Sequence, residues 1–85
     1  MASVSYNARE RRLVFESLCW PEDAPGLADA IGAFAEPAST LVVDLTRMPF
    51  VPSEVADAIE GACRAAEAAG CRVRVWHADP VPVAG

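Results

Sequence analysis

The chain has 85 residues, a length that fits one domain with a small core. Its formal net charge of −5 argues against nucleic acid and anionic membrane surfaces as partners, because both favour basic patches. A protein partner is therefore favoured.

The chain has no apolar run of the roughly 20 residues that span a bilayer, and residues 1–12 lack the basic-then-apolar pattern of a secretory signal. These features predict a cytoplasmic protein. The three cysteines, Cys19, Cys63 and Cys71, lack metal-type spacing, so we expect reduced thiols and no disulfide.

The first 18 residues predict a β-hairpin. Val4 and Tyr6 alternate with serines, and residues 7–11 form a polar turn. Residues 12–18 then alternate again, with Leu13 and Phe15 on one face and Val14 on the other.

Turn residues at positions 19–26 precede a first predicted helix. Asp23 is placed to cap it, and Pro25 suits its first turn. Leu27, Ile31 and Phe34 recur at helical spacing, which indicates an apolar stripe facing a sheet, and Pro37 ends the helix.

Residues 41–45, LVVDL, predict the central strand, and their nearly unbroken apolar run is typical of a strand covered on both faces. A loop containing Pro49 and Pro52 follows, and Ser53 stands where a helix N-cap is expected. In open α/β sheets, functional sites collect at such strand-to-helix corners.

A second helix follows, with an apolar face and an acidic face, and Gly70 is its expected stop. Its apolar face is formed by Val55, Ile59, Ala62, Cys63 and Ala66. The last strand, residues 71–77, alternates strictly between Cys71, Val73 and Val75 on one side and Arg72, Arg74 and Trp76 on the other. This alternation predicts an edge strand with one open face.

The stretches DLTRMPFVPS and AAEAAGCRVRVW resemble those of a STAS domain, the fold of bacterial anti-sigma factor antagonists. The residues in register with that family's pattern are Asp44, Leu45, Phe50, Ser53, Ala66 and Gly70. The resemblance implies an α/β fold over residues 1–85. The expected sheet has four mostly parallel strands with an N-terminal antiparallel hairpin, and two crossover helices.

The chain departs from the family pattern in three places. Pro52 replaces the Asp that precedes the phosphorylatable Ser, and Glu54 and Val55 replace the Ser-Gly that follows it. The prolines of residues 79–85 rule out the terminal helix that the family usually adds. We therefore expect an apolar patch that a partner or a second copy covers.

The resemblance implies a non-catalytic regulatory module for protein–protein interaction in bacterial signalling and transcription regulation. Its partner would be a GHKL-type anti-sigma factor kinase or another regulatory protein. Phosphorylation of Ser53 would be its switch, although Ser53 also has a plain reading as a cap. The predicted partner-binding residues are Asp44, Phe50, Val51, Pro52, Ser53, Glu54, Asp57 and Trp76.

Two other functions stay open. The first is a divergent, unphosphorylated structural STAS subunit of a signalling assembly or of a transporter ATPase. The second is a small-ligand binder, because some relatives of the fold are said to engage nucleotides. The acidic balance and the lack of a phosphate-binding loop argue against the second function.

Several single residues have two readings. Asp44 is either a partner contact or a cap of the turn that follows it. Trp20 and Trp76 are flanked by polar residues, and we expect at least one of them in the core. A metal site at Cys71, His77 and Asp79 is disfavoured because the chain has one histidine.

We expect neither a cofactor nor catalysis, since no nucleophile–base pattern is evident. The last expectation is a homodimer, or pairing with a related STAS subunit, with Trp76 and residues 81–83 at or near the contact.

Overall fold

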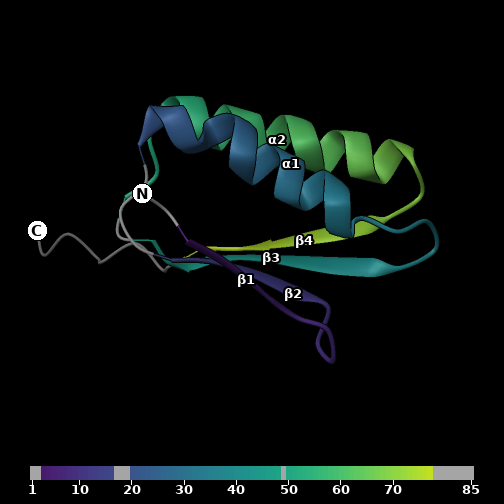
Figure 1. Cartoon of the computed structure of the whole chain (residues 1–85). Helices are drawn as coiled ribbons and strands as arrows, with labels where there is room; N and C mark the ends of the chain where they lie inside the picture. The colour runs from purple at the N-terminus through teal and green to yellow at the C-terminus, as the bar shows by residue number, and fades with distance from the viewer. Residues whose placement is uncertain (1–2, 17–19, 49, 78–85) are drawn as a thin grey trace, which may run out of the picture.

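The computed structural model describes residues 3–16, 20–48 and 50–77. A hairpin of two strands comes first, and helices and strands alternate after it (Figure 1). The elements are β1 (Ser3–Asn7), β2 (Arg12–Glu16), the short 3-10 helix η1 (Pro21–Asp23), α1 (Ala24–Phe34), β3 (Thr40–Arg47), α2 (Ser53–Ala68) and β4 (Arg72–Trp76).

The strands form one sheet in the order β1-β2-β3-β4. The hairpin strands β1 and β2 pair antiparallel, while β2 with β3 and β3 with β4 pair parallel. The register places Leu13 beside Val43, and Val43 beside Val75. This arrangement confirms the predicted four-stranded, mostly parallel sheet with β3 in its interior. The last two residues predicted for the second strand, 17 and 18, lie outside the described residues.

Both helices lie on the same face of the sheet, so the prediction that β3 is covered on both faces was wrong (Figure 1). The strand order moves in one direction from β2 to β3 to β4. Because crossover connections between parallel strands are right-handed, two successive crossovers in one direction put their helices on the same side. Val42 and Asp44 consequently point to the opposite, helix-free face, which we call the open face.

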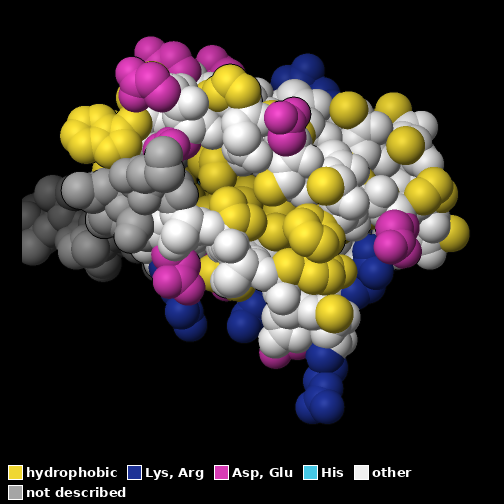
Figure 2. All heavy atoms as spheres, viewed as in Figure 1, with side chains coloured by type: hydrophobic (Ala, Val, Ile, Leu, Met, Phe, Trp, Pro, Cys, Tyr) yellow, Lys and Arg dark blue, Asp and Glu magenta, His cyan; other side chains and the backbone are white. Residues whose placement is uncertain are grey.

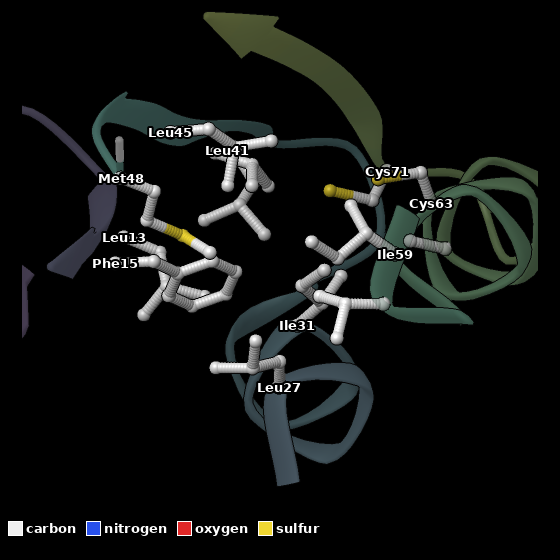
Figure 3. Packing of buried hydrophobic residues seen from close by; sticks show 13 residues of the cluster. Leu13, Phe15, Leu27, Ile31, Leu41, Leu45, Met48, Ile59, Cys63 and Cys71 are labelled. Atoms are coloured by element: carbon white, nitrogen blue, oxygen red, sulfur yellow. The ribbon is translucent and has the colours of Figure 1, made fainter. Parts of the chain in front are cut away.

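The core fills the space between the sheet and the two helices (Figure 3). From the sheet, Leu13, Phe15, Leu41 and Val43 are fully buried. The buried residues of the helices are Leu27 and Ile31 from α1, and Val55, Ile59, Cys63 and Ala66 from α2. The predicted apolar faces of both helices are thus confirmed, with Ala62 half-buried beside them.

An aromatic pair closes the core at the β1 edge of the sheet. The rings of Tyr6 from β1 and Phe34 from α1 stack with their centroids 4.1 Å apart. Figure 2 shows hydrophobic side chains gathered in this seam between α1 and the β1–β2 hairpin.

The hairpin turn and the loops before β3 and β4 lie at the same end of the molecule (Figure 1). Hydrogen bonds connect these segments. The Arg11 guanidinium donates to the carbonyl oxygens of Thr40 at 3.0 Å and Phe34 at 3.3 Å. Gly70 ends α2 with a φ of 98°, as predicted, because this left-handed conformation favours glycine. Its carbonyl accepts from the Ala38 N–H at 2.9 Å.

The start of α1 follows the prediction in position but not in every contact. Asp23 is the N-cap residue of α1. Its carboxylate accepts a hydrogen bond from the Trp20 N–H at 2.9 Å, so it reaches back to close η1. The helix ends at Phe34, three residues before Pro37.

Candidate functional site

The loop between β3 and α2 is held by buried residues and presents an exposed aromatic ring. Met48 is buried in the core, and its N–H donates to the Leu45 carbonyl at 3.1 Å. Pro52 is buried, and Val51 packs against the core. Between these anchors, 67% of Phe50 is exposed, which is high for a ring of this size. Pro49 lies outside the described residues.

Pro52, rather than Ser53, occupies the N-cap position of α2, so the predicted cap was wrong by one residue. Pro52 has the extended backbone of an N-cap, with φ −58° and ψ 151°, and its carbonyl accepts from the Ala56 N–H at 2.9 Å. Ser53 is therefore the first helical residue, and its exposed hydroxyl donates to the Glu54 carboxylate at 3.4 Å. A hydroxyl there is open to solvent at the positive end of the helix dipole.

Two exposed aromatic residues lie at this end of the molecule. Trp20, at the start of η1, is 55% exposed, and η1 contacts α2. Figure 2 shows acidic side chains gathered at the same end, over the starts of the two helices. We call the group Trp20, Phe50, Val51, Ser53, Glu54 and Asp57 the corner surface. The predicted partner-binding set did not include Trp20, although its polar neighbours already indicated exposure.

Asp44 does not belong to the corner surface. Its neighbours in the sheet register are Val14 and Trp76, and all three point to the open face. Asp44 is only 5% exposed, and its carboxylate accepts from the Thr46 N–H at 2.9 Å and the Thr46 hydroxyl at 2.6 Å. These bonds match the predicted alternative in which Asp44 caps the turn that follows it.

The charge of Asp44 is balanced by arginine. Burial by itself raises the pKa of Asp44, but the two bonds from Thr46 and the charges of Arg12 and Arg47 outweigh it. The net effect holds the pKa of Asp44 below its ordinary value, so the carboxylate is ionised at neutral pH.

Arg12 connects Asp44 to Trp76 across the open face. Its Nε lies 3.9 Å from the Asp44 carboxylate, and its guanidinium carbon lies 5.9 Å from the centroid of the Trp76 ring. Arg12 Nε is buried and makes no hydrogen bond among the described residues. Trp76 remains 42% exposed. The expectation that one tryptophan lies in the core was wrong, because Trp20 and Trp76 both reach solvent.

The predicted partner-binding residues thus divide into two surfaces. At the corner, the first surface is formed by residues at and just before the start of α2, together with Trp20 before η1, which contacts α2. These residues of α2 and its loop are Phe50, Val51, Ser53, Glu54 and Asp57. Asp44 and Trp76 meet on the open face.

The other candidate chemistry is limited in the described part of the chain. Cys63 and Cys71 are free buried thiols, and Cys19 and Asp79 lie outside the described residues. Within residues 3–16, 20–48 and 50–77, no three His, Cys, Asp or Glu side chains gather as a metal site would require. The described helices include none that is long and apolar enough to cross a membrane.

No family model and no curated protein matches the sequence. The chain is similar to a solved structure described as a crystal structure analysis of Mglu, with a TM-score of 0.63 at 18% identity. That similarity covers 95% of this chain and 20% of the Mglu chain, so this chain spans about a fifth of that protein.

A second similar structure is that of an antisigma-factor antagonist, a STAS domain from Rhodobacter sphaeroides. Its TM-score is 0.58 at 18% identity, and the similarity covers 89% of this chain and 84% of that one. The sheet order and the two helices on one face define a small α/β domain with parallel crossovers. The fold is that of a STAS domain, which confirms the fold that the sequence motifs indicated.

Proposed function

We propose that this chain is a non-catalytic regulatory module that binds a protein partner through the corner surface. The observation that carries the proposal is the loop before α2, where Phe50 is exposed between the buried residues Met48 and Pro52. An aromatic side chain has only two rotatable bonds and therefore loses little conformational freedom on binding, and such residues often dominate the energy of protein interfaces.

Acidic residues set the chemistry of the partner. Glu54 and Asp57 are exposed beside the aromatic residues of the corner surface, and Glu22 is exposed in η1 next to Trp20. A partner with an apolar pocket and a basic rim complements this surface. The STAS fold supports a partner of the anti-sigma factor kinase type, and the chain would then act in the control of transcription.

Phe50→Asp tests the corner surface by placing a charge where the partner needs an apolar ring. We expect the immobilised variant to lose the proteins that the wild-type chain captures from an extract of its own host. The matched control is Ala8→Asp, which adds the same charge at an exposed position of the hairpin turn. Capture of the same proteins by wild type and both variants would contradict the proposal.

Whether Ser53 is phosphorylated distinguishes two functions. One is a regulatory module switched by phosphorylation, and the other is an unphosphorylated structural subunit of a signalling assembly or transporter ATPase. The exposure of Ser53 on the first turn of α2 favours the switch, because a phosphate there meets unpaired N–H groups. The Glu54 carboxylate, 3.4 Å from its hydroxyl, favours the structural subunit because it repels a phosphate. Intact-mass analysis after incubation with the captured partner and ATP separates the two, with Ser53→Ala as control.

Trp76 supports a second contact, between two copies of the chain or with a related STAS subunit. It is an exposed ring on the open face, at the edge strand of the sheet. We expect Trp76→Glu to weaken self-association by about 2 kcal/mol while the fold stays intact. Light scattering during size-exclusion chromatography measures this, with Ser5→Glu on the same face as control. A wild type that is monomeric at high concentration would contradict the dimer.

A further inference from the structure

A groove of about 610 Å³ lies between α2 and the end of β4, on the face of the sheet that carries the helices. Its floor is apolar and includes Leu45, Ile59, Cys63 and Val75. Burial, with the Glu67 carboxylate adding to it, raises the pKa of the Cys63 thiol, so this sulfur is neutral and part of the apolar floor.

The two edges of the helix layer differ. At the β1 edge, the stacked rings of Tyr6 and Phe34 fill the seam between sheet and helix. At the β4 edge, α2 lines the groove with smaller side chains such as Ala56 and Cys63. Among the described residues, no further helix lies beyond α2 on this side (Figure 1).

The dimensions of the groove suit a short helix. The lining residues of α2 run from Ala56 to Glu67, and at about 1.5 Å per residue this distance is roughly 16 Å, or three helical turns. An α-helix laid alongside α2 would pack on it in the way that α1 does on the other side.

The charged residues that line the groove indicate the charge of the segment that would bind there. Glu60 and Glu67 line the groove together with Arg64, and Arg64 Nη2 lies 2.7 Å from a Glu60 oxygen. Among the α2 residues that line the groove, two carboxylates stand against one arginine, so this wall of the groove carries net negative charge. A basic segment complements it and an acidic one is repelled.

We propose that this groove binds an amphipathic helix of a partner protein, about three turns long, with lysine or arginine flanking its apolar face. The apolar face would lie over Ala56 and Val75, above the buried Ile59 and Cys63, and the basic flanks would meet Glu60 and Glu67. Val51 of the corner surface also lines the groove, but Trp20 and Phe50 do not, so a change at Phe50 tests the two surfaces separately.

Two synthetic peptides test this proposal, each an amphipathic helix of three to four turns with the same leucine face. One carries lysine flanks and the other carries glutamate flanks. In ¹H–¹⁵N spectra of the full chain, we expect the lysine peptide to shift signals of residues 56–67 and 75–77. The glutamate peptide should leave these signals in place.

Two variants locate the binding. Ala56→Arg adds a long side chain at the groove, and we expect it to weaken the lysine peptide roughly tenfold or more, as loss of a central contact does. Ala65→Arg adds the same charge at an exposed position of α2 outside the groove, and it should change the affinity by less than about threefold. Phe50→Asp should leave peptide binding intact, which separates this test from that of the corner surface.

Several outcomes would overturn the proposal. These are equal binding of both peptides, no binding of either, shifts centred elsewhere, or equal effects of the two alanine variants. Val81→Asp tests the chain's own tail as the occupant. If this change shifts the groove signals without peptide and strengthens peptide binding, the tail fills the groove and the proposed partner helix is wrong.

Discussion

Phe15→Ala should lower the free energy of unfolding by about 3–5 kcal/mol, a larger loss than we expect from any of the other variants. The Phe15 ring has no exposed surface and belongs to the buried cluster between the sheet and the helices, together with Leu27 of α1 (Figure 3). Removing it loses apolar burial and leaves a cavity that surrounding residues fill only in part. A domain of this size has a total stability of roughly 5–15 kcal/mol, so the variant will be close to unfolding at room temperature.

Phe50→Ala is the matched control, because it removes the same ring from an exposed position. We expect a change within about 0.5 kcal/mol. Urea denaturation followed by circular dichroism measures both variants against the wild type. Equal losses would mean that Phe50 is packed in the folded chain, which would remove the main support for the corner surface.

Asp44→Ala should be the second most damaging change, at about 3 kcal/mol near neutral pH. The variant removes the acceptor for the Thr46 N–H and hydroxyl and takes away one of two charge partners of Arg12, leaving the Glu10 carboxylate at 3.1 Å. Most of the loss comes from the Thr46 N–H, which is left without an acceptor, and the weakened pairing of Arg12 adds to it. The same denaturation experiment measures the free energy of unfolding of this variant. A loss under about 1 kcal/mol would mean that the contacts of Asp44 with Thr46 and Arg12 contribute little to stability.

The pH dependence of stability provides a separate test of Asp44. Because the folded-state pKa of Asp44 lies below its ordinary value of 3.8, its contribution is complete above that value and is lost as the pH falls through the folded-state pKa. Asp44→Asn keeps an acceptor oxygen but removes this titration. The stability difference between wild type and Asp44→Asn should therefore shrink as the solution is acidified below pH 3.8. A difference that stays constant would show that the charge of Asp44 contributes nothing.

Alternation and helical spacing predicted most of the fold. Leu13 and Phe15 share a face because side chains alternate along a strand, and Val55, Ile59, Cys63 and Ala66 share one because of the 3.6-residue helical period. Gly70 marked the end of α2 because its backbone conformation favours glycine. These features depend on neighbours in the sequence, and a single sequence records them directly.

Two features of the fold differ from the prediction. The nearly unbroken apolar run of residues 41–45 suggested a strand covered on both faces, but the handedness of two successive crossovers put both helices on one side. Ser53 looked like the N-cap because serine is common there, yet the extended backbone of Pro52 supplied that position.

The candidate site was predicted in part. The corner residues Phe50 to Asp57 are close in sequence, so their grouping followed from the motif. The meeting of Arg12, Asp44 and Trp76 depends on the register of three strands, and the groove depends on where α2 lies over β4. A sequence pattern within one strand or helix records neither the register between strands nor the position of α2 over β4.

Site-specific photo-crosslinking at position 50 is the most direct test of the central claim that the corner surface binds a protein partner. A photoreactive phenylalanine analogue would replace Phe50 in cells, and a second strain would carry it at Ala8 in the exposed hairpin turn. We expect a defined crosslinked protein from position 50 and none from position 8. The same crosslinks from both positions, or none from position 50, would contradict the account.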